Sequence, residues 1–204
     1  MARTPKVVED RREQIIDAAI RVFAQRGFTR ATNKDIAQEA GITPGLIYYY
    51  FESKGRLLEA IFEARSPIRL LDHMSPDMLS LPPEVFLRAL LIDAFAIIEQ
   101  ENFVQLIRIV LPEVLHGSAD IRPVTMTFFQ RILTFLTHYF ESRSAQGALR
   151  PGDALLTAQI FFSSVLGFVL RRYIFEDPLA QRYSPEHIAD AIVTTVLHGI
   201  LADA

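Results

Sequence analysis

One stretch near the N-terminus, residues 32–54 with the sequence TNKDIAQEAGITPGLIYYYFESK, constrains the fold more than any other part of the chain. Thr32 is a good N-cap residue, and Asp35 three positions later completes an acidic variant of the capping box. Gly41 is a helix stop, because glycine adopts a positive φ without a Cβ clash. Thr43 is a second N-cap residue and is followed by a proline at the first helical position. The stretch therefore predicts two short helices joined by a tight turn.

Two short helices with this spacing are typical of a helix-turn-helix, in which the second helix enters the major groove of DNA. The predicted second helix, residues 44–50, is only about 10 Å long, which suits the insertion of its N-terminal end into a groove. Gly45 lets the backbone approach DNA closely, and Leu46 is placed to contact a thymine methyl group. The three tyrosines that follow offer hydroxyl groups to phosphates and ring faces to sugars.

The helix N-termini of this stretch supply further candidates, because their free N–H groups hold phosphates. Lys54, at the start of the next helix, is poorly placed for the helix dipole, which favours a role at a phosphate. A structural three-helix unit without DNA is the alternative, but three successive tyrosines near a glycine are unusual for packing alone. The predicted DNA-contacting residues are Thr32, Asn33, Lys34, Thr43, Pro44, Gly45, Leu46, Tyr48, Tyr49, Tyr50 and Lys54.

The same stretch closely resembles the DNA-binding domain of transcriptional regulators of the TetR family (TetR/AcrR type). The residues that carry the resemblance are IAQEAGIT, GLIYYYF and ESKGRLL, and the match extends upstream to IIDAAIRVFAQRGFTRAT. Gly55 is a departure, because the family usually has an acidic residue at this position. The resemblance implies DNA contacts by Thr32, Lys34, Gly45, Tyr48, Tyr49 and Lys54.

Composition limits the other classes of protein. Half of the 204 residues are apolar and none is cysteine, which excludes disulfides, thiol catalysis and cysteine-ligated metals and fits a cytoplasmic location. The first residues are polar, so no signal peptide is expected. The longest uncharged run, 154–170, contains threonine, glutamine and serine, which favours a buried or interface helix over a membrane span. The net charge of −3 does not indicate nucleic-acid binding, so the DNA prediction rests on the motif.

The segment 66–83 contains several prolines and is predicted to be a hinge or loop, and the chain after it has helical periodicity without an alternating strand pattern. We therefore predict an all-α fold. Residues 1–52 form the helix-turn-helix DNA-binding domain, a three-helix head. Residues 53–204 form a helical bundle for ligand binding and dimerisation, and its first helix, the fourth of the chain, links the two parts. The resemblance implies nine helices in total, which agrees with the pattern.

The second half of the chain is rich in aromatic residues with few polar partners, a composition that suits an apolar cavity. Ordinary core packing is the alternative for each of these residues. The resemblance implies a ligand pocket in this bundle. Because the bundle offers many phenylalanines and few charges, we expect a mostly apolar ligand with one polar anchor such as His138 or Arg108, although surface pairing is the alternative for Arg108. The predicted pocket residues are Phe95, Phe103, Arg108, Phe128, Phe129, Phe135, His138 and Phe162.

The last two predicted helices each carry an apolar stripe at helical spacing. A lone bundle can use one such stripe, whereas two adjoining stripes leave extra apolar surface to bury. The resemblance implies that these helices pair with those of a second copy as a four-helix bundle, and Ser163 and Gly167 allow close approach. The predicted dimer-interface residues are Phe161, Val165, Phe168, Ile192, Val196 and Ile200.

The sequence offers no paired carboxylates, nucleophile elbow, phosphate loop or Ser/His/Asp pattern, and its histidines lack metal-ligand spacing. We therefore expect neither an enzyme nor a bound metal or cofactor. The favoured function is a cytoplasmic repressor that binds a palindromic operator in double-stranded DNA as a homodimer, is released by a small hydrophobic effector and has no membrane role. The alternatives are a helical protein that binds a hydrophobic ligand and has a non-functional DNA-binding head, and an enzyme built in the bundle.

Overall fold

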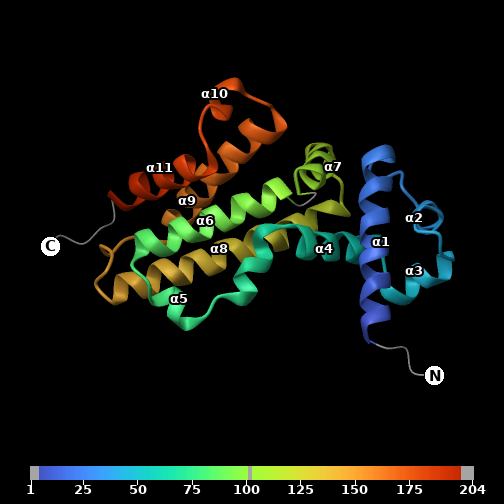
Figure 1. Cartoon of the computed structure of the whole chain (residues 1–204), viewed down its shortest axis with the longest axis horizontal. Helices are drawn as coiled ribbons and strands as arrows, with labels where there is room; N and C mark the ends of the chain where they lie inside the picture. Colours follow the sequence, from blue (N-terminus) through green and yellow to red (C-terminus); the bar gives the residue numbers. More distant parts are fainter. Residues whose placement is uncertain (1–4, 101–102, 199–204) are drawn as a thin grey trace. The chain divides into compact units, whose positions relative to one another are not determined.

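The computed structural model describes residues 5–100 and 103–198, which form helices and connecting turns without a β-strand (Figure 1). The all-α fold predicted from the sequence is confirmed. The α-helices are α1 (Pro5–Arg26), α2 (Asn33–Glu39), α3 (Pro44–Tyr50), α4 (Lys54–Arg65), α5 (Pro76–Ser80), α6 (Pro83–Gln100), α7 (Phe103–Leu115), α8 (Ile121–Ala145), α9 (Ala154–Val169), α10 (Pro178–Gln181) and α11 (Pro185–His198). A 3-10 helix, η1 (Pro67–His73), precedes α5, and a π-helical segment, η2 (Leu170–Ile174), continues α9.

The predicted number of about nine helices matches α1–α4, α6–α9 and α11, and it is too low for the described residues because the connections contain short helices. α5 and α10 each begin with a proline at a first helical position, behind the N-cap residues Ser75 and Asp177. η1 and α5 occupy most of the segment 66–83, for which the sequence predicts a hinge or loop. Prolines that interrupt the longer helices therefore also begin short ones: Pro67 begins η1, Pro76 begins α5 and Pro178 begins α10.

The chain divides into two compact units that are discontinuous in sequence. The first unit contains residues 1–66 and 102–126, and the second contains residues 67–101 and 127–204. α7 and the start of α8 thus belong to the same unit as the helix-turn-helix. The predicted boundary after residue 52 separates a DNA-binding part from a ligand-binding and dimerisation part. It divides the chain by function and not by packing, and it stays a prediction.

The first unit is built on α1, which packs against α2, α4 and α7. Its core consists of the buried side chains Ile15, Ile16, Phe23, Phe28, Ile36, Leu57, Leu58, Ile61 and Leu106. Arg65, in the last turn of α4, donates to Glu13 at 2.6 Å and to Asp17 at 2.9 Å, both on α1. Burial opposes the charge of Arg65, but its two acidic partners outweigh burial and raise the pKa of Arg65. The C-terminal end of α4 is therefore fixed to α1.

The second unit packs α11 against α6 and α9. A chain of aromatic rings runs from Phe86 on α6 to Tyr139 and Phe140 on α8 and on to Phe161 on α9, with successive ring centroids 4.6, 5.6 and 6.1 Å apart. Tilted and edge-to-face pairs at these separations stabilise a core beyond the area that they bury. Much of the aromatic composition of the second half is therefore core packing.

One helical stretch, Ala154–Ile174, is long and apolar enough to cross a membrane by length and composition, and a single stretch of this kind is weak evidence for a span. Its mean hydropathy is 1.6, and only 17% of its apolar window is buried inside the described structure. α9 therefore leaves a large share of its apolar surface exposed in the single chain.

Candidate nucleic-acid interface

The start of α2 forms the capping box that the sequence predicts. The side chain of Thr32 accepts a hydrogen bond from the Asp35 N–H at 3.2 Å, and the Asp35 carboxylate accepts one from the Thr32 N–H at 3.0 Å. The hydrogen bonds from Thr32 hold the pKa of Asp35 below its ordinary value. These reciprocal bonds satisfy N–H groups that a helix start leaves open, so local chemistry sets where α2 begins.

The turn between α2 and α3 also follows the sequence prediction. Gly41 has a φ of +63°, the left-handed region in which glycine has no Cβ penalty. The N–H of Ile42 then donates to the carbonyl of Ala37 at 2.9 Å, which closes the end of α2. α3 begins at Pro44 behind the N-cap residue Thr43, whose hydroxyl makes no capping hydrogen bond. The Thr43 hydroxyl is therefore not committed to its own helix.

One face of α3 is buried and the other is open. Ile47 is fully buried and anchors the helix on the core of the first unit. Tyr48 and Tyr49 are 60% and 71% exposed, which is unusual for side chains of this size. Gly45 is exposed, and a Cβ built on it would meet no heavy atom within 4 Å. The N-terminal half of α3 therefore has open space at the Gly45 backbone, and two exposed aromatic side chains follow on the same helix.

Two buried polar groups of α2 and α3 have no hydrogen-bond partner among the described residues. The Oδ1 atom of Asn33 and the hydroxyl of Tyr50 are buried and make no hydrogen bond. Such groups are unfavourable until a partner arrives, and the two ends of the Asn33 amide exchange donor for acceptor when the side chain flips. Lys34 is exposed, and Leu46 is half-buried. Unused hydrogen-bonding capacity thus lies at the start of α2 and at the end of α3.

Lys54 has partners other than the phosphate that the sequence predicts. Its ammonium donates to the carbonyls of Phe28, Thr29 and Ala31 at 2.8, 3.1 and 3.1 Å. The ammonium also lies 4.5 Å from the centroid of the Phe28 ring. Burial lowers the pKa of Lys54, and the nearby acids Asp120 and Glu113 oppose this shift. A lysine has three N–H donors, and all three are used here within the chain.

The predicted ligand-pocket residues fall into both units. Phe103 and Arg108 belong to the first unit, where Phe103 is buried and Arg108 is exposed. In the second unit Phe95 is buried, Phe135 lies 6.5 Å from Phe86 between ring centroids, and Phe128, Phe129 and Phe162 form a cluster with ring centroids 5.7 and 5.8 Å apart. His138 is exposed and lines a shallow surface groove of about 300 Å³ with Gln130, Leu133, Thr134, Thr137, Glu141 and Leu155. Both predicted polar anchors are therefore surface residues.

Of the predicted dimer-interface residues that the structure describes, two are buried and three are half-buried. Phe161 and Ile192 are 2% and 4% exposed and pack in the core of their own chain, while Val165, Phe168 and Val196 are half-buried. Ile200 lies outside the described residues. The exposed apolar side chains of α9 are instead Leu155, Leu156 and Ile160. The exposed face of α9 mixes apolar residues with small or polar ones such as Gln159 and Ser163, so the periodicity gives only a weak signal of which face turns inward.

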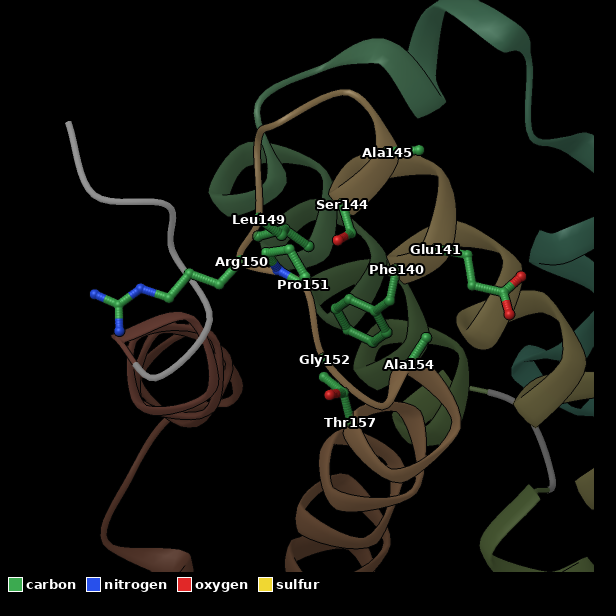
Figure 2. Close-up of a pocket in the computed structure, with 10 residues that line it drawn as sticks. All are labelled: Phe140, Glu141, Ser144, Ala145, Leu149, Arg150, Pro151, Gly152, Ala154 and Thr157. Atoms are coloured by element: carbon green, nitrogen blue, oxygen red, sulfur yellow. The ribbon is translucent and has the colours of Figure 1, made fainter.

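A separate groove of about 400 Å³ lies at the connection between α8 and α9, and Figure 2 shows its lining residues. Phe140, Leu149 and Ala154 give it apolar walls, whereas the side chain of Arg150 extends away from the other labelled residues. The described residues contain no group of three or more metal-ligating side chains, here or elsewhere.

Two family models match the chain. Residues 15–61 match the model described as bacterial regulatory proteins, tetR family, and residues 86–199 match the model described as AefR-like transcriptional repressor, C-terminal domain. The curated relative TtgR of Pseudomonas putida, an HTH-type transcriptional regulator, is 44% identical over 62 residues, and the match spans 30% of this chain and 30% of TtgR. The chain thus aligns with less than a third of that relative.

Solved structures resemble the chain over nearly its whole length. SmeT from Stenotrophomonas maltophilia, in a complex with triclosan, has a TM-score of 0.77 at 24% identity, and the match covers 96% of this chain and 93% of SmeT. FadR from Bacillus subtilis, in a complex with stearoyl-CoA, has a TM-score of 0.73 at 22% identity, covering 92% of this chain and 98% of FadR. These likenesses concern the fold.

The first unit therefore has the architecture of a helix-turn-helix protein of the transcription-regulator class, with α3 in the position of the recognition helix. The second family model alone spans more than half of the sequence. The chain belongs to the tetR family of bacterial regulatory proteins.

Proposed function

We propose that the protein is a cytoplasmic transcriptional repressor that binds a palindromic DNA operator as a homodimer and is released by a small hydrophobic effector. The observation that carries the DNA-binding part is the open face of α3, where Gly45 leaves the backbone bare and Tyr48 and Tyr49 stand exposed. Two large exposed aromatic side chains on a seven-residue helix have little use in the isolated chain. Against DNA, their hydroxyls reach phosphates and their rings cover sugars.

The proposed contacts divide into two groups. The backbone-positioning group lies at helix starts, where free N–H groups favour phosphate, and consists of Thr32, Asn33, Lys34, Thr43 and Pro44. The groove-facing group is on α3 and consists of Gly45, Leu46, Tyr48, Tyr49 and Tyr50. Lys54 is not included in either group, because its three donors are already paired with carbonyl oxygens.

The dimer that we propose uses the exposed face of α9. Leu156, Ile160, Ser163 and Gly167 follow one another at intervals of four, three and four residues, and all four are exposed. This spacing is that of a helix–helix seam, and the two small residues permit close approach. α11 packs beside α9 and exposes Ala191. This seam replaces the predicted one, in which Phe161 and Ile192 are occupied by core packing.

The proposed effector is small and hydrophobic. Two proteins of similar fold are known in complexes with molecules that carry apolar groups, SmeT with triclosan and FadR with stearoyl-CoA, of which the second also carries a polar coenzyme A group. In this chain the aromatic cluster of Phe128, Phe129 and Phe162 is the strongest candidate for an apolar lining. A carrier protein with a non-functional head is less favoured, because the head keeps its capping box, its glycine turn and an exposed recognition face.

Selection of binding sequences from a pool of random duplex DNA, followed by fluorescence anisotropy on the best duplex, tests this proposal. The parent should select a two-fold symmetric site with half-sites about one helical turn, 34–36 Å, apart. Tyr49→Ala should weaken binding about 5- to 150-fold, since a base contact contributes about 1–3 kcal/mol. Tyr183→Ala is the matched control, because Tyr183 is also exposed, 54%, but lies outside the helix-turn-helix. Failure of the parent to enrich any sequence contradicts the proposal.

A further inference from the structure

The connection between α1 and α2, residues 27–32, sets how the helix-turn-helix leaves α1. Gly27 ends α1 with a φ of +76°. The next residue, Phe28, is completely buried, and its ring centroid lies 5.1 Å from that of Phe23. Ala31 is also buried, and Thr32 then caps α2. The position of α2, and of α3 packed against it, therefore depends on this short connection in addition to the direct packing of α2 against α1.

Lys54 holds the connection from α4. Its ammonium donates to three carbonyls in a row of four residues, those of Phe28, Thr29 and Ala31. Charge-assisted hydrogen bonds are roughly twice as strong as neutral ones, and the half-buried site screens them less than bulk water does. Lys54 therefore gathers the carbonyls of the connection around one cation.

Glu113 holds the same connection from α7. The N–H of Thr29 donates to its Oε1 atom at 3.0 Å, and the hydroxyl of Thr29 donates to its Oε2 atom at 2.6 Å. Burial favours the neutral form of Glu113, but the two hydrogen bonds from Thr29 outweigh burial and hold the pKa of Glu113 below its ordinary value. The carboxylate thus has both oxygens engaged on a residue 84 positions earlier in the chain.

Thr29 joins the two charged groups. Its N–H and hydroxyl point to the anion, and its carbonyl accepts from the cation, so the peptide dipoles lie between opposite charges. Lys54 and Glu113 also attract one another electrostatically. Removal of either charge leaves the other half-buried with fewer partners, which makes the arrangement cooperative.

We propose that Lys54 and Glu113 form a bracket of opposite charges around the α1–α2 connection, which positions the helix-turn-helix for DNA. In this arrangement Lys54 is a positioning residue rather than a phosphate ligand, and the DNA-reading unit includes Glu113 on α7. The inference rests on the proposed function, since its readout is operator binding. It differs from that function in assigning DNA affinity to an acidic side chain and to a lysine that does not touch DNA.

The dependence of operator affinity on salt distinguishes the two roles of Lys54. A lysine that contacts phosphate releases a counterion, and its loss reduces the slope of log K against log salt by about 0.9. We expect Lys54→Met to weaken binding at least about tenfold, the effect of losing a charge-assisted hydrogen bond, with the slope of the parent unchanged. Lys34→Met is the comparator, because Lys34 is exposed at the start of α2 and should lose about 0.9 of slope. A comparable loss of slope in Lys54→Met overturns the inference.

The sign of the Glu113 effect gives an independent test. An acidic residue that only faces solvent near DNA repels phosphate, so its neutralisation strengthens binding. The bracket predicts the opposite: Glu113→Ala and Thr29→Val should both weaken operator binding about tenfold. Their double variant should be no weaker than Glu113→Ala alone, since both remove the same contact. Stronger or unchanged binding by Glu113→Ala, or additive losses in the double variant, contradicts the bracket.

Controls separate these outcomes from misfolding and from failure of the proposed function. Each variant should keep the helical circular dichroism of the parent at the assay temperature, and Glu113→Gln, which retains one acceptor for Thr29, should recover part of the affinity. If the parent binds no selected duplex, the proposed function and this role both fail. If the parent binds, but Lys54→Met reduces the salt slope or Glu113→Ala leaves binding unchanged or stronger, only the bracket fails.

Discussion

The exposed face of α9 offers the cleanest test of the proposed dimer, because a substitution there leaves the core of the single chain intact. Ile160 and Leu156 are each 53% exposed and lie four residues apart on that face. We predict that Ile160→Asp yields folded monomers. The predicted monomers should also lose operator binding, since one head engages only one half-site.

The expected size of the effect follows from these exposures. Complete burial of a leucine or isoleucine stabilises by about 1.5–3 kcal/mol, so burial of the exposed half contributes about 1 kcal/mol per side chain. A two-fold symmetric dimer uses every position twice, so Ile160 contributes about 2 kcal/mol. Ile160→Asp removes this and also desolvates two unpaired carboxylates at an apolar seam, which costs several kcal/mol more. The dissociation constant should therefore rise at least a thousandfold, which corresponds to about 4 kcal/mol.

Sedimentation equilibrium over a range of concentrations measures this dissociation constant directly. Leu179→Asp is the matched control, because Leu179 is similarly exposed, 56%, but lies on α10 outside the proposed seam. The control should dissociate and unfold like the parent, whereas Ile160→Asp should keep the parental helical circular dichroism at the assay temperature but unfold at a lower temperature, because it lacks the stabilisation by the dimer. A dimer of Ile160→Asp with parental affinity would refute the assignment of α9 as the interface, and a parent that is monomeric throughout would refute the dimer.

Two further predictions concern the stability of the first unit. Phe28→Ala should destabilise the protein by about 3–5 kcal/mol, the usual result of truncating a fully buried phenylalanine. Phe175→Ala, at an exposed position, is the control and should change the thermal midpoint little. Thermal unfolding followed by circular dichroism compares the two variants. Asp35→Asn should destabilise the protein at pH 7 by weakening the capping box. Because the folded pKa of Asp35 is lowered, the extra stability of the parent over the variant is complete above the unfolded pKa of about 3.8 and disappears as pH falls through the lower folded value. Urea midpoints of parent and variant that differ by the same amount at pH 7 and at pH 3 would contradict this prediction.

The helix-turn-helix is predictable from the sequence because its determinants are local. Thr32 and Asp35 find each other three residues apart, and Gly41 ends α2 through its own φ. The additional short helices carry local signals as well, since Ser75 precedes a proline just as Thr43 does. The sequence nevertheless predicts a hinge or loop over residues 66–83, because a cluster of prolines marks an interruption more strongly than a start.

The faces of α9 are not predictable in the same way. Apolar and polar residues are mixed on the exposed face of α9, which makes its amphipathic signal weak, so tertiary packing decides that Phe161 turns inward while Ile160 turns outward. Adjacent residues point in directions about 100° apart, so a rotation of the helix by about that angle would exchange their roles. The sequence does contain a finer signal, the small residues Ser163 and Gly167 in line with Leu156 and Ile160. Burial in the folded chain, rather than hydrophobicity, separates the proposed seam from the core.

The contacts of α4 show what this means for coupling between ligand and DNA. Lys54 ties the first turn of α4 to the α1–α2 connection, and Arg65 ties its last turn to α1 through Glu13 and Asp17. Glu113 adds α7 to the same assembly through Thr29. Both ends of α4 are therefore fixed within the first unit by charge-assisted hydrogen bonds, which leaves no joint between α4 and the helix-turn-helix. An effector that changes DNA affinity must then displace the first unit as one body, with α7 included, or break one of these charged contacts, and it can do so only to the extent that it binds the two arrangements with different affinity.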